Sequence, residues 1–62
     1  MQDRWVVTFI TARGEFRFWE DYRDRSIQMA REMMALGALG AEVYDTRRSV
    51  VAWAKGQKTS DN

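Results

Sequence analysis

Large apolar residues recur at alternate positions on each side of Arg13-Gly14 in residues 5–22, WVVTFITA-RG-EFRFWEDY, and this is the strongest pattern in the chain. A period of two is typical of β-strands, and the β-branched and aromatic residues over 4–12 also favour extended structure. Glycine tolerates the positive φ of a tight turn. The pattern therefore predicts strands at 4–12 and 15–22, joined by a two-residue turn at Arg13-Gly14.

Folding this hairpin about its turn divides the side chains between two faces. The first face is predicted to hold Trp5, Val7, Phe9, Phe16, Phe18 and Tyr22. It needs a helix or a second sheet to cover it. The second face is predicted to hold Val6, Thr8, Ile10, Arg17 and Trp19. That set carries more apolar area than a simply solvated face needs, which is the main clue to function.

The register of this hairpin follows from the position of its turn. With residue 12 opposite residue 15, the pairs are Phe9 with Phe18, Thr8 with Trp19, and Trp5 with Tyr22. Aromatic and β-branched pairs of this kind stabilise antiparallel ladders.

Helical spacing replaces the alternation after the hairpin. Residues 24–36 contain strong helix formers and no proline, and Asp24 is the expected N-cap with Ser26 as the second candidate. Gly37 and Gly40 are expected to stop the helix.

The predicted helix has an unusually wide apolar side. Its central stripe is Ile27, Ala30, Met33 and Met34. Met29 and Leu36 widen the stripe beyond what a helix needs to cover its own sheet, so both are candidates for contact with a partner. The simpler interpretation makes these methionines core filler.

A second hairpin is predicted from residues 41–46 and 49–55, with Arg47 and Arg48 at its tip. If its loop has an even number of residues, Ala41, Val43, Val50, Ala52 and Ala54 share one face. Tyr44, Val51 and Trp53 then share the other face, together with Trp19 and Ile10. An odd loop would break this register.

The element order ββαββ predicts an α+β fold of two layers. A four-stranded antiparallel sheet has one helix packed on one face. Residues 1–56 are expected to form this single domain, and residues 57–62 a flexible polar tail.

Size and composition limit the ways in which this domain can be stabilised. A domain of 62 residues buries only roughly 60% of the surface that its unfolded chain exposes. The chain has no Cys and no His, which excludes disulfides and thiolate zinc sites and removes the commonest metal ligand and general base. Self-association is the remaining means of stabilising it, and we expect a homo-oligomer, either a homodimer or a higher oligomer, with the dimer favoured.

Charge and hydropathy restrict location and partners. Ten Lys and Arg stand against nine Asp and Glu, which argues against a strongly polyanion-driven protein and against an acidic mimic of nucleic acid. No signal-peptide pattern and no membrane-length apolar run is present. With no cysteine, the expected location is the cytoplasm.

The candidate binding residues lie on the second sheet face and on the flank of the helix. They are Ile10, Arg17, Trp19, Tyr44, Val51, Trp53, Met29 and Leu36. Trp, Tyr and Arg are enriched at the energetic centres of protein interfaces, so this set predicts a dimer or partner surface. The competing interpretation is that the register is wrong and these side chains are core.

A nucleic-acid-binding module is the alternative function. Its residues would be Arg13, Arg17, Trp19, Arg47, Arg48 and Trp53, with bases stacked on the tryptophans. Against it, the same strands hold Glu15, Glu20, Asp21, Glu42 and Asp45, and no RNP-type pattern is present.

Catalytic chemistry finds little support. Glu20 and Asp21 are adjacent on a strand and point to opposite faces, and Asp24 is better used as a cap. No Ser/His/Asp set or phosphate-binding glycine loop is present, so we expect no enzyme activity, cofactor, metal or small-molecule substrate.

In size, lack of Cys and element order, the chain resembles very short proteins common in bacteriophage and other mobile-element genomes. That resemblance implies a host or phage protein as partner. The expected function is that of a small, non-catalytic interaction protein, self-associating, that modulates another protein.

Overall fold

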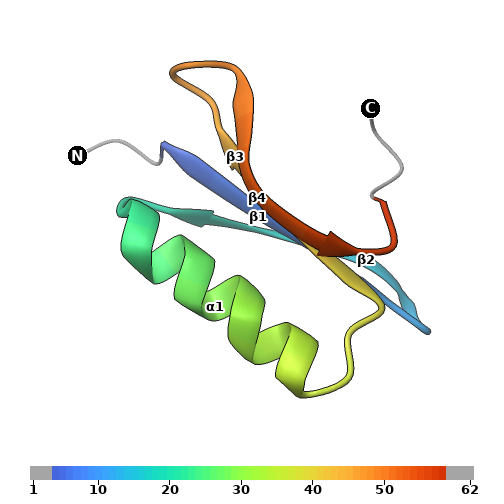
Figure 1. The fold of residues 1–62 in the computed structure, drawn as a ribbon. Coiled ribbons are helices and arrows are strands. Elements are labelled where there is room, and N and C mark those ends of the chain that lie inside the picture. The colour runs from blue at the N-terminus through green and yellow to red at the C-terminus, as the bar shows by residue number, and fades with distance from the viewer. Residues whose placement is uncertain (1–3, 59–62) are drawn as a thin grey trace.

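A computed structural model describes residues 4–58. Its elements are β1 (Trp5–Thr11), β2 (Gly14–Glu20), α1 (Arg23–Ala35), β3 (Gly40–Asp45) and β4 (Val50–Gly56). All strand pairs are antiparallel and form one sheet in the order β2-β1-β3-β4. The helix lies across one face of this sheet (Figure 1). The predicted α+β fold of two layers with ββαββ order is therefore confirmed.

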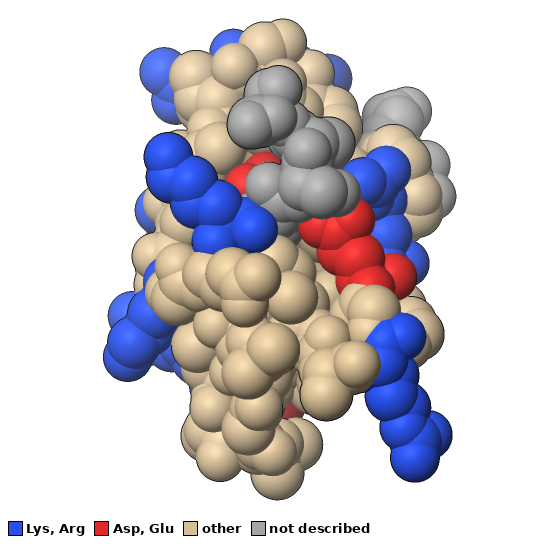
Figure 2. All heavy atoms as spheres, turned by 90° about the vertical axis from the view of Figure 1, so that its right-hand side faces the viewer, with Lys and Arg blue, Asp and Glu red and all other residues tan. Residues whose placement is uncertain are grey.

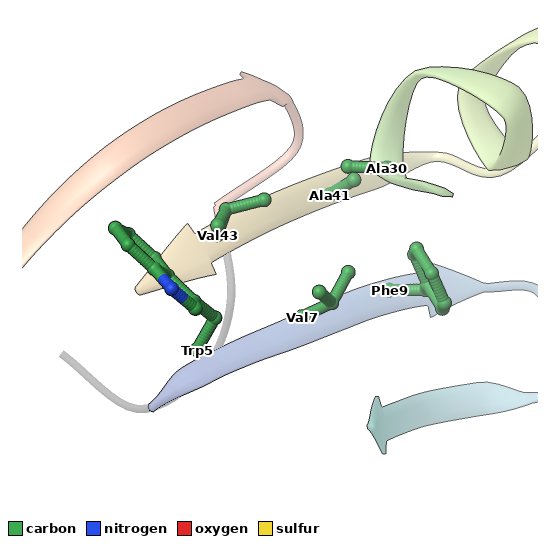
Figure 3. Close-up of a cluster of buried hydrophobic side chains, with 6 residues drawn as sticks. All are labelled: Trp5, Val7, Phe9, Ala30, Ala41 and Val43. Atoms are coloured by element: carbon green, nitrogen blue, oxygen red, sulfur yellow. The ribbon is translucent and has the colours of Figure 1, made fainter. Parts of the chain in front are cut away.

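The core lies between α1 and the two central strands. Trp5, Val7 and Phe9 from β1 point to the same side as Ala41 and Val43 from β3 (Figure 3). Ala30 closes this cluster from the helix. Ile27, Met33 and Met34 pack around it while staying partly exposed, which confirms the predicted stripe as core. Met29, which was predicted on the flank of this stripe, also packs against the core. The helix packs mainly on β1 and β3, so the edge strands receive less cover.

The first turn differs by one position from its prediction. Ala12 and Arg13 form the turn, and Gly14 begins β2 with a φ of 130°. The Thr11 hydroxyl donates to the Gly14 carbonyl at 3.1 Å and accepts from the Arg13 amide at 3.1 Å. This side-chain bridge stabilises a tight reversal without Asn-Gly.

Moving the turn shifts the register of the first hairpin by two residues. The observed partners are Phe9 with Phe16, Val7 with Phe18, Thr8 with Arg17, Val6 with Trp19, and Trp5 with Glu20. The predicted pairs were therefore wrong. A shift of two keeps the side chains of β1 and β2 on their predicted faces. Tyr22 was predicted to continue the second strand, but β2 ends at Glu20 and Tyr22 is the N-cap of α1, so that prediction was wrong. Phe9 still contacts Phe18 diagonally, with ring centroids 5.5 Å apart.

Phe16 and Phe18 occupy the predicted face but are far from fully buried, with 46% and 48% of their surfaces exposed. The reason is their place on the edge strand β2, beyond the reach of most of the helix. The helix therefore leaves this edge of the apolar face without full cover.

The helix begins earlier than expected. Its N-cap is Tyr22, which makes no side-chain capping bond, so the prediction of Asp24 as cap was wrong. Asp24 instead lies in the first turn of the helix, where its negative charge interacts favourably with the positive end of the helix dipole. Ser26 is fully buried, and its hydroxyl donates to the Tyr22 carbonyl at 2.8 Å.

The end of the helix is a Schellman motif. The Ala38 amide donates to the Met33 carbonyl at 3.0 Å, and the Gly37 amide donates to Met34 at 3.1 Å. Gly37 has a φ of 110°, so the predicted stop at this residue is confirmed. Gly40 plays no part in the stop, because it already begins β3.

A bulge divides the second hairpin into two registers. Next to the turn, Asp45 faces Val50 and Tyr44 faces Val51, as an even loop predicts. Beyond the shift at Val43/Tyr44, Val43 faces Trp53. Ala52 is the extra residue of β4. Each later residue of β4 therefore lies on the face opposite to the one predicted.

The polar C-terminal segment is described only in part. The Gln57 amide donates to the Leu39 carbonyl at 2.9 Å, which ties the residue after β4 to the entry of β3. Residues 59–62 of the predicted tail lie outside the described residues.

Candidate binding surface

One row of side chains crosses all the strands on the sheet face opposite the helix. Trp19 on β2 faces Val6 on β1, Val6 faces Tyr44 on β3, and Tyr44 faces Val51 on β4. We call these four residues the aromatic row and this face the outer face. Trp19 and Val51 are 55% and 50% exposed, whereas Val6 is buried between its neighbours. The row is therefore a continuous apolar strip with exposed ends.

A polar row runs beside the aromatic row. Arg17 faces Thr8, and Thr8 faces Glu42 on the other side. Thr8 is only 4% exposed and lies between the longer residues Arg17 and Glu42. Together with Thr46, the two rows line an open groove of about 500 Å³. Its apolar strip and charged margin have the make-up of a protein interface, with an apolar centre and a polar rim.

Most of the predicted sheet residues do share the outer face. Arg17, Trp19, Tyr44 and Val51 line the groove. Ile10 lies on the same face one row further along, opposite Glu15 and Gly40. The structure thus brings five of the predicted binding residues onto one face.

Trp53 is the exception among the sheet residues. It faces Val43 after the bulge and packs against the core on the helix side. Its predicted place beside Trp19 was wrong, because Ala52 shifts the register between Val51 and Trp53. Ala54 changes face for the same reason and now lies opposite Glu42.

The two predicted helix residues have separate environments. Met29 is half-buried and packs against the core. Leu36 is the C-cap residue and is 80% exposed. Both residues belong to α1, which lies on one side of the sheet, whereas the outer face is on the other side. They are therefore not part of the groove surface.

The arginines of the nucleic-acid alternative do not converge. Arg13 follows the end of β1, whereas Arg47 and Arg48 lie in the turn beside the start of β1, where the Thr46 amide donates to the Arg4 carbonyl at 3.0 Å. The two hairpin turns therefore lie at opposite ends of the sheet (Figure 1). On the side of the molecule drawn in Figure 2, Lys and Arg are spread along the margins with acidic side chains between them.

Asp45 organises the turn that carries Arg47 and Arg48. Its carboxylate is almost fully buried, and Oδ1 accepts from the Arg47 and Arg48 amides at 3.0 and 3.3 Å. Arg4 donates to the same carboxylate from Nε and Nη2. The pKa of Asp45 is lowered from 3.8 to about 2, mainly by the hydrogen bond from Arg4, against the opposing effect of burial. Backbone bonds from the turn lower it further.

Sequence reasoning missed this structural role of Asp45. The available signal was an aspartate followed directly by a polar turn, the pattern in which a carboxylate accepts bonds from amides two or three residues on. The partner Arg4 had no local signal, since it lies 41 positions away in the chain.

Residues 4–58 offer neither a metal cluster nor a membrane-spanning helix. Within them, no group of three or more His, Cys, Asp or Glu is placed to hold a metal ion. The described part of the chain also contains no helix with the length and apolar character that a membrane crossing requires.

Comparison with known proteins gave no relative. No family model, no curated protein and no solved structure matches this chain.

Proposed function

We propose that this protein is a small, non-catalytic interaction protein that binds and modulates another protein through the outer face. The aromatic row carries this proposal, because it extends across all the strands of the sheet on the face opposite α1. Leaving Trp19 more than half exposed is unfavourable for an isolated domain, and binding would remove that apolar surface from water.

The chemistry of the groove favours a protein as the ligand. Trp19 and Tyr44 belong to the residue types that dominate the energetics of protein interfaces. Arg17 and Glu42 flank them with opposite charges, which suits a polar rim. The partner is expected to present an apolar side chain to the aromatic row and polar groups to this rim.

The distribution of arginines favours a protein over a nucleic acid. A single-strand binder needs cations that follow one backbone path past the stacked bases. Here only Arg17 and Trp19 of the alternative set share the outer face, and the remaining arginines lie at the two ends of the sheet. Trp53 packs on the helix side.

Self-association in the cytoplasm is part of the proposal. The small core supports a homodimer, and a chain without cysteine needs no oxidising compartment. The resemblance to short mobile-element proteins supports a host or phage protein as the modulated partner.

Site-specific photo-cross-linking tests the proposed function. A photo-reactive amino acid replaces Val51 on the outer face or, as the matched control, the exposed Gln28 on the helix. We expect one protein to be cross-linked from position 51 and not from position 28. Equal yields from the two positions would contradict the proposal.

A nucleic-acid product from position 51 would support the alternative function instead. Titration with single- and double-stranded oligonucleotides at two salt concentrations provides the independent check, because phosphate-driven binding weakens steeply with salt. We expect no binding at low salt.

A further inference from the structure

The two edge strands of the sheet differ in how well they are protected. β4 carries a bulge within its length, and bulges disrupt the regular ladder that a further strand would need. β2 pairs with β1 over seven consecutive residues without a register shift. It contains neither proline nor lysine, the residues that commonly block an exposed edge. The free side of β2 is therefore the open edge of this sheet.

Apolar side chains lie along the same edge. Phe16 and Phe18 point to the helix side of the sheet and remain about half exposed, at 46% and 48%. The helix packs over β1 and β3 and touches β2 little. A strand added beside β2 would cover these rings and satisfy the backbone groups of the edge at the same time.

The charges on the outer side of β2 fit a second copy of the same strand. Glu15 and Arg17 are two positions apart and share the outer face. In an antiparallel pair related by two-fold symmetry about Phe16, Glu15 of each copy faces Arg17 of the other. Opposite charges at facing positions stabilise such a ladder, and Phe16 then faces Phe16 on the helix side. Glu15 and Arg17 also interact within their own chain. The complementarity between the two copies therefore concerns the signs and the positions of these charges.

We propose that the protein self-associates by antiparallel pairing of β2 with β2 of a second copy, which forms one continuous sheet across the dimer. This inference rests on the self-association in the proposed function and names the surface that provides it. The outer face stays open in this arrangement, so the aromatic row of each copy remains free for the partner protein.

Charge-reversal variants test the pairing by complementation between chains. Glu15→Arg and Arg17→Glu each place like charges opposite each other twice in the dimer, and each is expected to weaken dimerisation about tenfold or more. Mixing the two variants restores both opposite-charge pairs, because a strand with two arginines at these positions then faces a strand with two glutamates. Sedimentation equilibrium of each variant and of the mixture measures the effect, with circular dichroism as the check on folding.

Lys55→Glu is the matched control, since it makes the same change of charge as Arg17→Glu on the other edge strand. It is expected to leave the dimer constant unchanged. A mixture that dimerises no better than its components would overturn the inference, as would a wild-type chain that stays monomeric. Neither result affects cross-linking from position 51, so the proposed partner surface is judged separately.

Discussion

Arg4 and Asp45 form a two-point ion pair that joins the start of β1 to the end of β3. Arg4 Nε lies 2.9 Å from Asp45 Oδ1, and Nη2 lies 2.8 Å from Oδ2. The Arg4 guanidinium also lies 4.8 Å from the centre of the Trp5 ring. Since Asp45 Oδ1 further accepts the amides of Arg47 and Arg48, one carboxylate fixes both a strand end and a turn.

This arrangement predicts a loss of stability in acid. The pKa of Asp45 is about 2 in the folded chain, below its ordinary value of 3.8. A carboxylate whose pKa is lowered by folding stabilises the folded state. This stabilisation is complete at pH values above the ordinary pKa, and it is lost as the pH falls through the pKa of the folded state. We expect the melting temperature of the wild type to fall between about pH 4 and about pH 2.

Asp45→Asn tests the origin of that loss. The variant is expected to melt at a lower temperature at neutral pH and to lack this part of the acid dependence. Asp24→Asn is the control, because the Asp24 side chain is fully exposed. Thermal unfolding by circular dichroism measures both. An acid profile of Asp45→Asn that parallels the wild type would contradict the assignment.

Two glycines are predicted to resist substitution for different reasons. Gly37 has a φ of 110° and open space around an added Cβ, so Gly37→Ala is expected to cost about 1–2 kcal/mol from backbone strain alone. At Gly40 an added Cβ would meet the Gln57 carbonyl. Gly40→Ala is therefore expected to cost more than Gly37→Ala. Urea denaturation ranks the two variants. The reverse order would show that the backbone of Gln57 can move away from Gly40.

The edge position of Phe18 lowers the expected cost of its removal. Phe9 is 2% exposed, so Phe9→Ala is expected to destabilise by about 3–5 kcal/mol. Phe18 is 48% exposed and is expected to lose roughly half as much in Phe18→Ala, because less apolar surface is transferred from water. Denaturant unfolding of the two variants provides the comparison. The comparison is made at a protein concentration that keeps the chain monomeric, because the proposed pairing of β2 would cover Phe18. Equal costs under that condition would show that Phe18 is buried within a single chain.

Trp19 and Trp5 are expected to separate binding from folding. Trp5 is 5% exposed, and Trp5→Ala is expected to unfold so small a domain. Trp19→Ala is expected to change the free energy of unfolding by about 1 kcal/mol, since the Trp19 side chain is 55% exposed and lies opposite Val6 in the sheet. Chemical denaturation decides between the two roles. A collapse of the fold in Trp19→Ala would remove Trp19 from the candidate binding residues.

The sequence alone was sufficient to predict the elements in which the hydrophobic periodicity is strong. Alternation along β1 and β2 assigned each side chain to its correct face even though the turn was misplaced, because a shift of two residues preserves the faces. The helix stop at Gly37 was also readable, since a left-handed C′ residue favours glycine.

The parts that could not be predicted depend on tertiary packing. β4 contains no glycine or proline at its bulge, so nothing local marks Ala52 as the extra residue. Its effect is large, because it moves Trp53 from the outer face to the core side. The exposure of Phe16 and Phe18 likewise depends on where the helix crosses the sheet, which the helix sequence alone does not specify.

The most direct measurement of the central claim is the cross-link yield from position 51 when the aromatic row is altered. Trp19→Ala and Tyr44→Ala are compared with Leu36→Ala, which removes an exposed apolar side chain from the helix instead. We expect the cross-link to a partner protein to be lost in the first two variants and kept in the third, with all three folded. An unchanged yield in Trp19→Ala and Tyr44→Ala would contradict the account.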